Sequence, residues 1–292
     1  MLKMKIAMNG ALCAADTAVI SVYDHGFLYG MGLFETFRTY GGQPFLLEEH
    51  LQRLAEGCRE LSIAYEPDIG RIETLVTQLL SVNGMEDAYF RLSVSAGVDV
   101  LGLPGEEYGK PAEIIYIKSL PVPATGNGGK ALQLLATRRN TPEGETRLKS
   151  FHYMNAINGK RELDRYPWAQ GAEGLFLDDC GFVAEGIVSN VFFVQEGVLR
   201  TPALDTCILP GITRDWVIQA ASAQGIPVEE GFYPWEALLE AEEIFLTNSV
   251  AEIVPVNRLF DNDGNVQTVA DGKIGAVTEK LKELYREATQ PD

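Results

Sequence analysis

Apolar residues recur at intervals of three and four along two stretches in the first third of the chain. In LLEEHLQRLAEGCREL, residues 46–61, apolar side chains stand at positions 47, 51, 54, 58 and 61. The stretch IGRIETLVTQLLSVNG, residues 69–84, has the same kind of spacing. Because an α-helix turns once every 3.6 residues, each stretch predicts an amphipathic helix with one face directed to a core.

Short apolar runs that end in glycine or in polar turn residues predict β-strands elsewhere. The chain opens with a short strand near KIAMNGAL, and GLFETFRTY and QPFLL, on either side of Gly41 and Gly42, resemble the arms of a hairpin. Further strands are predicted in YFRLSVSAG, AEIIYIK, ALQLLATRR, GLFLDDCGFVAEG and NVFFVQEGVLRTP, and further helices over about 153–166, 213–225 and 277–288. The lack of a regular βαβ alternation favours an α+β or mixed α/β fold over a doubly wound sheet.

A composition break divides the chain near its middle. The segment LPVPATGNGGK, residues 120–130, gathers two prolines and three glycines between two strand-like runs. Such a segment interrupts regular structure. We therefore expect an N-terminal domain over 1–119, a linker over 120–130 and a C-terminal domain over 131–292.

Composition and charge narrow the class of partner. The 292 residues are 46% hydrophobic, enough for a substantial core, and the net charge is −17 at pH 7. Nucleic acid and anionic membranes would repel such a chain, whereas a small anionic ligand needs only a few local cations and amides. Four scattered cysteines without metal-ligand spacing, and no long apolar run, lead us to expect a cytoplasmic protein without a metal site.

Two segments carry the most informative chemistry. RLKSFHYMN places Lys149 among aromatic and apolar neighbours, and VAEGIVSNVFF contains Glu185. A lysine that forms a Schiff base needs a carbonyl cofactor, and the pyridine nitrogen of pyridoxal 5'-phosphate needs a carboxylate that keeps it protonated. Together the two segments predict a pyridoxal phosphate site, although either residue alone is more often a solvated surface residue.

The cofactor's phosphate requires a further site, for which LDTCILPGITRDW is the candidate. The amides of Ile212 and Thr213 would be unpaired N–H groups at a helix start, where anions bind. Arg53 can add charge if Leu51 and Leu54 pack inward, and Ser249 in FLTNSVAEIVPV can add a hydroxyl. The alternatives are a simple turn at PGIT, a solvated helix arginine and a β-turn after the strand.

Taken in order, these segments resemble fold-type IV pyridoxal phosphate enzymes, the group of branched-chain aminotransferases, D-amino-acid aminotransferases and 4-amino-4-deoxychorismate lyases. The resemblance spans nearly the whole chain, and it is greatest to the lyases through DHGFLYGMGLFETFR, RLSVSAG, RRNTPEGETRLKSFHYMNA and TNSVAEI. It implies a smaller N-terminal and a larger C-terminal domain with the cofactor between them, and a homodimer.

The resemblance also implies roles for single residues. Lys149 forms the Schiff base, Glu185 contacts the pyridine nitrogen, and Arg53, Ile212, Thr213 and Ser249 hold the phosphate. The implied reaction is conversion of 4-amino-4-deoxychorismate, a small-molecule substrate, to 4-aminobenzoate and pyruvate for folate synthesis. Branched-chain aminotransferases typically show GTAAE where this chain has NSVAE, so Val250 supplies no hydroxyl there. An aminotransferase acting on D- or branched-chain amino acids is the alternative.

Overall fold

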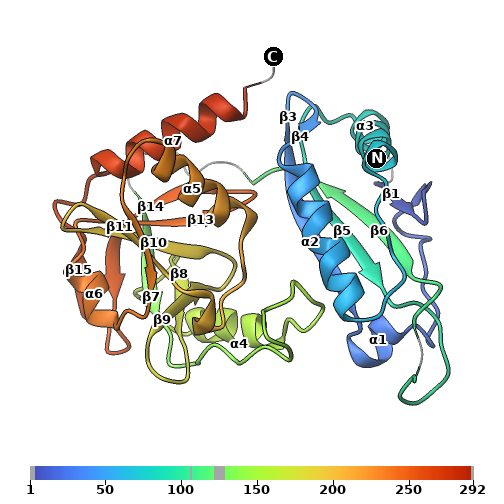
Figure 1. Ribbon diagram of the computed structural model, residues 1–292, viewed down its shortest axis with the longest axis horizontal. Coiled ribbons are helices and arrows are strands. Elements are labelled where there is room, and N and C mark those ends of the chain that lie inside the picture. The colour runs from blue at the N-terminus through green and yellow to red at the C-terminus, as the bar shows by residue number, and fades with distance from the viewer. Residues whose placement is uncertain (1–3, 106, 122–128, 291–292) are drawn as a thin grey trace. The chain divides into compact units, whose positions relative to one another are not determined.

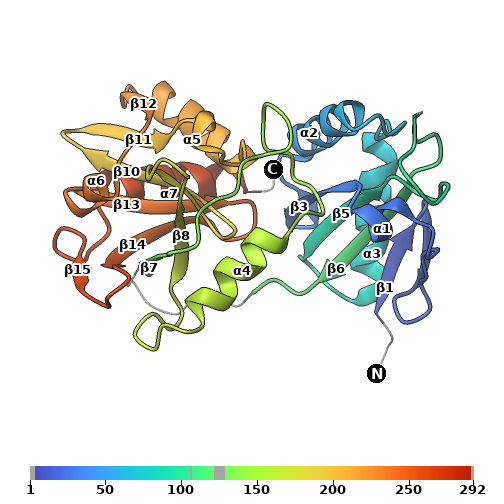
Figure 2. The same ribbon diagram turned by 90° about the horizontal axis from the view of Figure 1, so that it is seen from below.

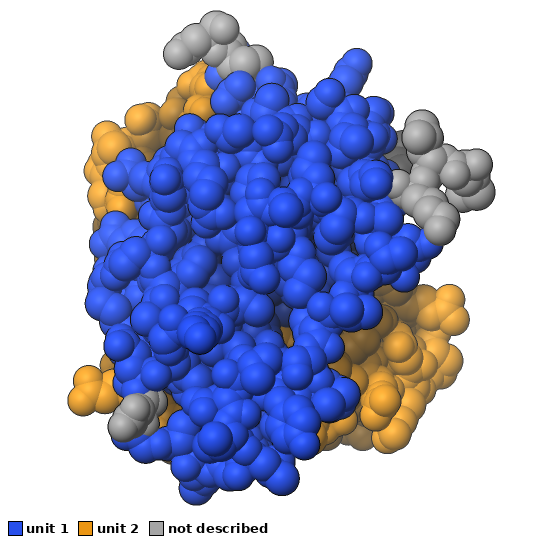
Figure 3. Space-filling view, turned by 90° about the vertical axis from the view of Figure 1, so that its right-hand side faces the viewer, with its two compact units in different colours: residues 1–122, 148–152, 289–292 blue, residues 123–147, 153–288 orange. Residues whose placement is uncertain are grey.

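The computed structural model describes residues 4–105, 107–121 and 129–290, which divide into two compact units. Unit 1 comprises residues 1–122, 148–152 and 289–292, and unit 2 comprises residues 123–147 and 153–288 (Figures 1 and 3). Most of the predicted linker, residues 122–128, lies outside the described residues.

Unit 1 is built on an antiparallel sheet, six-stranded in the described part of the chain, with the order β2-β1-β6-β5-β3-β4. Its longest strand, β3, pairs along its length with β5, from Gly32 opposite Ser95 to Arg38 opposite Tyr89. The strands are β1 (Lys5–Met8), β2 (Ala11–Ala14), β3 (Gly32–Tyr40), β4 (Gln43–Pro44), β5 (Tyr89–Ser95) and β6 (Ala112–Lys118).

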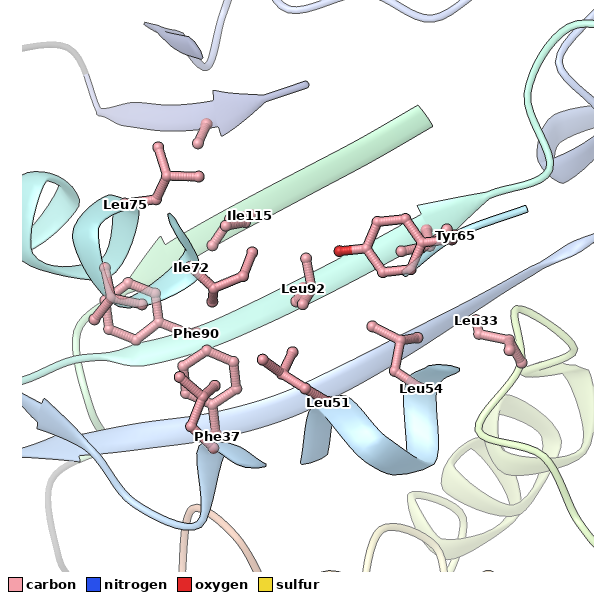
Figure 4. Close-up of a cluster of buried hydrophobic side chains, with 14 of the residues drawn as sticks. Leu33, Phe37, Leu51, Leu54, Tyr65, Ile72, Leu75, Phe90, Leu92 and Ile115 are labelled. Atoms are coloured by element: carbon pink, nitrogen blue, oxygen red, sulfur yellow. The ribbon is translucent and has the colours of Figure 1, made fainter. Parts of the chain in front are cut away.

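Two amphipathic helices, α2 (Leu47–Glu60) and α3 (Ile69–Asn83), join this sheet in a single core, as their spacing predicted. Figure 4 shows Leu51 and Leu54 of α2 directed at the sheet, and both are at most 2% exposed. Asp68 caps the start of α3 by accepting a hydrogen bond from Arg71 N, and Gly84 ends it in the left-handed conformation. A short helix, α1 (His25–Tyr29), precedes β3.

The segment Leu148–His152 packs with unit 1, although the sequence division assigned it to the second domain. Phe34 N donates to Lys149 O at 2.9 Å, and Phe151 N donates to Gly32 O at 3.0 Å. These bonds, with an antiparallel bridge between Leu33 and Ser150, add the segment alongside β3. Pairing between positions more than a hundred residues apart cannot be read from local periodicity.

Unit 2 contains a mixed sheet, nine-stranded in the described residues, with the order β12-β11-β10-β13-β14-β7-β8-β9 and β15 beside β14. The pairs β11–β12, β14–β7 and β7–β8 are parallel and the others antiparallel. The strands are β7 (Lys130–Leu134), β8 (Glu173–Leu177), β9 (Val183–Gly186), β10 (Asn190–Gln195), β11 (Val198–Pro202), β12 (Val228–Gly231), β13 (Glu243–Asn248), β14 (Glu252–Phe260) and β15 (Val266–Thr268).

Helices cover this second sheet. Helices α5 (Ile212–Ala223) and α7 (Ala276–Ala288) pack against each other and against β13, and α7 also contacts β14 (Figure 1). Helix α4 (Met154–Leu163) contacts β8 (Figure 2). A 3₁₀ turn, η1 (Leu204–Thr206), precedes α5, and α6 (Trp235–Leu239) contributes Trp235 and Leu238 to the apolar core.

The predicted fold class, α+β or mixed α/β, is confirmed, with two differences in detail. The single strand expected near KIAMNGAL is a hairpin, because Asn9 and Gly10 both adopt positive φ and form the turn between β1 and β2. The second arm of the next hairpin is shorter than expected, because only Gln43 and Pro44 pair with β3 before the chain enters α2.

Candidate active site

Lys149 lies in unit 1 with its backbone carbonyl bonded to β3. Its Nζ is 4.9 Å from the centroid of the Phe34 ring, and Cζ of Arg91 is 3.5 Å from the same centroid. Phe34 is only 2% exposed, so its position is fixed by packing. Two cationic groups therefore gather around one rigid aromatic ring, whose π-electrons attract both.

A cavity of about 420 Å³ opens within unit 1 next to this group. Its lining includes Arg91, Ser93 and Ser95 of β5 and Phe151 of the lysine segment. Asp24, also in the lining, accepts hydrogen bonds from Gly26 N at 2.8 Å and from the Ser95 hydroxyl. The cavity thus combines apolar walls with the Arg91 guanidinium, serine hydroxyls and the Asp24 carboxylate, the mixture of apolar and convergent polar groups typical of a small-molecule site.

Arg53, predicted to contact phosphate, is held by a buried carboxylate of unit 1. Its Nε donates to Glu35 Oε1 at 2.8 Å and its Nη2 donates to Oε2 at 2.7 Å. His50 Nδ1 donates to Glu35 Oε2 at 2.6 Å. Burial opposes ionisation of Glu35, but the Arg53 charge and the His50 hydrogen bond together lower its pKa to about 2. Burial lowers the pKa of His50, which keeps its imidazole neutral.

Glu185 lies on β9 in unit 2, with its side chain 6% exposed. Arg139 Nε donates to its Oε1 at 2.7 Å, and Leu209 N donates to its Oε2 at 2.9 Å. Asn190 Nδ2 is 3.4 Å from Oε2, and Arg147 Nε is 3.8 Å from Oε1. These donors fix the orientation of the carboxylate.

Arg147 belongs to the same group. Burial, and then the neighbouring Arg139 charge, lower the pKa of Arg147, whose Nε also donates to Cys207 O. Arg139 is itself held by Asn155, whose Oδ1 accepts from Nη1 at 2.7 Å. In the sequence, Arg147 stands two residues before the candidate Schiff-base lysine, Lys149.

Helix α5 begins at Ile212, as the phosphate hypothesis required. Gly211 is its N-cap, and among the described residues no side chain caps it, so helix geometry leaves the first N–H groups without intrahelical acceptors. A Cβ at position 211 would collide with the Asn190 side chain, which explains glycine there. The Thr213 and Ser249 hydroxyls are 3.3 Å apart, so two predicted phosphate residues meet at this helix end.

Ser249 is presented by a turn after β13. Asn248 Oδ1 accepts from Val250 N at 3.0 Å and from Ala251 N at 2.7 Å, which fixes the backbone around the serine. On the same strand, Thr247 is paired with Asn190 and is 1% exposed. Its hydroxyl has no hydrogen-bond partner among the described residues, which is costly unless a bound group supplies one.

The structure thus groups the predicted residues in two sets. Unit 1 holds Lys149 and Arg53, while unit 2 holds Glu185, Ile212, Thr213 and Ser249. Sequence reasoning missed the supporting roles of Glu35, His50, Arg139 and Asn190. A signal was present for His50, which lies one helical turn before Arg53 on the same helix.

Other kinds of site find no support in the part of the chain that the structure describes. No cluster of three or more His, Cys, Asp or Glu side chains is arranged to hold a metal ion there. No helix within the described ranges is long and apolar enough to cross a membrane.

Comparison with known proteins places this geometry in a family. Residues 32–259 match the family model described as amino-transferase class IV. The matched span includes Arg53, Lys149, Glu185, Thr213 and Ser249. The chain belongs to the class IV aminotransferase family, which confirms the predicted fold-type IV class.

Individual relatives carry more than one activity. The chain is 41% identical over 288 residues to the aminodeoxychorismate lyase of Bacillus subtilis (strain 168), covering 96% of this chain and 93% of that protein. It is 38% identical over 286 residues to a Methanocaldococcus jannaschii protein provisionally named a branched-chain-amino-acid aminotransferase, covering 97% and 96%.

A solved structure bears on the cofactor. A T.th. branched-chain amino acid aminotransferase with pyridoxamine 5'-phosphate matches with a TM-score of 0.84 and 28% identity, covering 98% of this chain and 94% of that one. Pyridoxamine 5'-phosphate is the amino form of pyridoxal 5'-phosphate, so the predicted cofactor is confirmed at the level of the family.

Proposed function

We propose that the protein is a pyridoxal-phosphate-dependent aminodeoxychorismate lyase, which converts 4-amino-4-deoxychorismate to 4-aminobenzoate and pyruvate for folate synthesis. The observation that carries the proposal is the group around Phe34. Arg91 lies against this ring and lines the cavity of unit 1, and Lys149 Nζ lies over the same ring. The Lys149 amine and the anion-binding guanidinium of Arg91 thus both lie against the Phe34 ring. This arrangement suits a substrate that carries both a reactive amino group and carboxylates.

The residues present fit the cofactor. Lys149 would hold it covalently, Glu185 would contact its ring nitrogen, and Arg53 with Ile212, Thr213 and Ser249 would bind its phosphate. The uncapped start of α5, the paired hydroxyls of Thr213 and Ser249, and the unsatisfied Thr247 hydroxyl nearby in sequence all favour a bound anionic group.

When bound, pyridoxal phosphate supplies a ring that stabilises negative charge on the carbon bearing the substrate's amino group. Lys149 Nζ would act as the base that removes the proton from this carbon. Glu185, oriented by Arg139 and Leu209 N, would contact the ring nitrogen and favour its protonated form. Cleavage of the C–O bond to the enolpyruvyl group would release enolpyruvate, which takes up a proton to become pyruvate, and the aromatic ring that remains makes this direction favourable.

An aminotransferase acting on branched-chain or D-amino acids is the competing function, favoured by the 38% identity to the M. jannaschii relative. The lyase is preferred because of the 41% identity to the B. subtilis enzyme and because this chain has NSVAE where branched-chain aminotransferases typically show GTAAE. An aminotransferase requires a 2-oxo-acid acceptor, and the lyase requires none.

The test is an assay of pyruvate release without any added oxo acid. 4-Amino-4-deoxychorismate is made in situ from chorismate, glutamine and a synthase, and pyruvate is coupled to lactate dehydrogenase with loss of NADH. The proposal predicts pyruvate and 4-aminobenzoate in equal amounts. Absence of pyruvate, together with amino transfer to 2-oxoglutarate at ~1 s⁻¹ or faster, would replace the lyase by the aminotransferase.

We further propose that the enzyme is a cytoplasmic homodimer. Several apolar side chains on helix α1 and two loops of unit 1 are strongly exposed, among them Val19, Phe27, Leu101 and Leu103. A second subunit that covers them would remove this unfavourable exposure. The four cysteines are unpaired, as expected in a reducing compartment. Sedimentation equilibrium of the purified protein tests the dimer.

A further inference from the structure

Beneath Arg53 lies a polar cluster whose burial needs an explanation. The side chains of Glu35 and His50 are each 1% exposed, whereas that of Arg53 is 17% exposed. Burying an ion pair in a core costs several kcal/mol of desolvation, and well-packed apolar residues often serve stability equally well. The burial of Glu35 and His50 therefore suggests that they serve Arg53, the member of the cluster that reaches the surface of unit 1.

The contacts show what the cluster does to Arg53. Glu35 accepts from both Nε and Nη2, a bidentate arrangement that fixes the plane of the guanidinium and hence the direction of Nη1. His50 donates to the carboxylate oxygen that also binds Nη2, and so holds the carboxylate itself. With His50 neutral, Glu35 cancels the Arg53 charge. An anion at Arg53 would then be bound by directed N–H groups more than by net charge.

The position of Glu35 along β3 adds a second relation. The preceding residue is Phe34. Its backbone N–H donates a hydrogen bond to the carbonyl of Lys149, and its ring lies beneath the Lys149 amine. Consecutive strand residues point to opposite faces of a sheet. Two neighbouring residues of β3 thus support the two groups of unit 1 to which the cofactor is assigned, Lys149 through Phe34 and Arg53 through Glu35.

We propose that Glu35 and His50 are positioning residues that orient the Arg53 guanidinium toward the phosphate of the cofactor. This inference rests on the proposed binding of pyridoxal phosphate and concerns only its phosphate group. It makes a prediction opposite to that of simple electrostatics. Removing the Glu35 charge makes the surroundings of Arg53 more positive, which by charge alone strengthens phosphate binding, whereas loss of orientation weakens it.

The experiment compares two ligands of the apoenzyme, pyridoxal phosphate and pyridoxal, which lacks the phosphate. Dissociation constants are measured for the wild type, Glu35→Gln, His50→Asn and Arg53→Met. We expect Glu35→Gln to weaken pyridoxal phosphate binding on the order of tenfold and to leave pyridoxal binding unchanged. His50→Asn, whose amide can still donate to Glu35, should show a smaller loss of the same kind.

Two controls make the result specific. Glu66→Gln removes the partner of Arg59, an exposed pair whose arginine lies on the same helix, and should change neither dissociation constant. In an Arg53→Met background, Glu35→Gln should have no further effect on the ratio of the two constants, because the two residues act through one contact.

The outcomes separate this inference from the proposed function. Tighter binding of pyridoxal phosphate by Glu35→Gln, or equal weakening of both ligands, would overturn the positioning role. If Glu35→Gln does not fold, the His50 variants provide the test. The positioning role would be overturned if the ratio of the pyridoxal phosphate and pyridoxal dissociation constants were unchanged in His50→Asn and in His50→Leu. A wild type that binds neither ligand would instead defeat the proposed cofactor role, and a wild type that prefers the phosphorylated ligand would leave that role standing.

Discussion

Glu35 in unit 1 and Glu185 in unit 2 are buried carboxylates paired with arginines, and we assign the cofactor to opposite members of the two pairs. In unit 1 Glu35 is almost wholly buried and serves the more exposed Arg53. In unit 2 Arg139 supports Glu185, and the carboxylate is the group assigned to the cofactor. The difference lies in the remaining partners. Glu35 accepts hydrogen bonds from the side chains of His50 and Arg53. Glu185 also accepts one from the backbone amide of Leu209, which fixes the carboxylate to the fold. A buried ion pair therefore does not reveal which member acts.

Among the variants that test this comparison, we expect the largest loss of activity when Glu185 is replaced. Glu185→Gln keeps the shape of the side chain but removes the charge that holds a proton on the cofactor ring. We expect the variant to retain pyridoxal phosphate and to lose orders of magnitude in kcat. Steady-state kinetics and the cofactor content of the purified variant measure both quantities. Near-normal turnover would show that Glu185 is structural.

A smaller effect is expected at Arg139, the support of Glu185. Arg139→Met preserves much of the apolar stem but removes the donor to Oε1 and the link to Asn155. We expect kcat to fall by roughly 10–100-fold, as for the loss of a charge-assisted hydrogen bond of 1.5–3 kcal/mol, with little change in cofactor content. A loss of cofactor with unchanged kcat per bound cofactor would contradict the assigned role.

Replacing Arg53, the residue assigned to the cofactor in unit 1, should have the opposite result: cofactor binding should weaken more than kcat falls. Arg53→Met would remove the proposed charge-assisted contact to the phosphate, and such a contact contributes about 1.5–3 kcal/mol. We expect the cofactor to dissociate on dialysis, while kcat at saturating cofactor changes less than in Glu185→Gln. Unchanged retention of the cofactor would return Arg53 to the solvated helix arginine considered from the sequence.

The least visible difference is in stability at low pH. The pKa of Glu35 falls from 4.5 to about 2 on folding, so its ionised form stabilises the protein above pH 4.5. This contribution, about 3 kcal/mol for a shift of this size, is lost as the pH falls toward 2. Urea unfolding between pH 6 and 3 should show a flatter pH dependence in Glu35→Gln than in wild type. The exposed Glu66→Gln variant should match wild type.

The sequence predicted most of the secondary structure because apolar spacing records local geometry. The helix predicted around Leu51 and Leu54 agrees with α2 to within one residue at each end. The motifs that contain Lys149 and Glu185 predicted the family that the comparison confirms. The supporting role of Arg139 and the pairing of the Lys149 segment could not be predicted, because both depend on contacts between distant segments. Arg139 meets Glu185 across 46 residues, and the Lys149 segment joins β3. The Asn9–Gly10 turn was a local signal that the strand interpretation overlooked.

The central claim is that this chain binds pyridoxal phosphate covalently through Lys149. Borohydride reduction of the purified holoenzyme, followed by peptide mapping, fixes the cofactor to the amine that carries it. The account predicts a phosphopyridoxyl group on the peptide that contains Lys149, and no visible cofactor absorbance in Lys149→Ala. A phosphopyridoxyl group on Lys118 or Lys160 instead would contradict it.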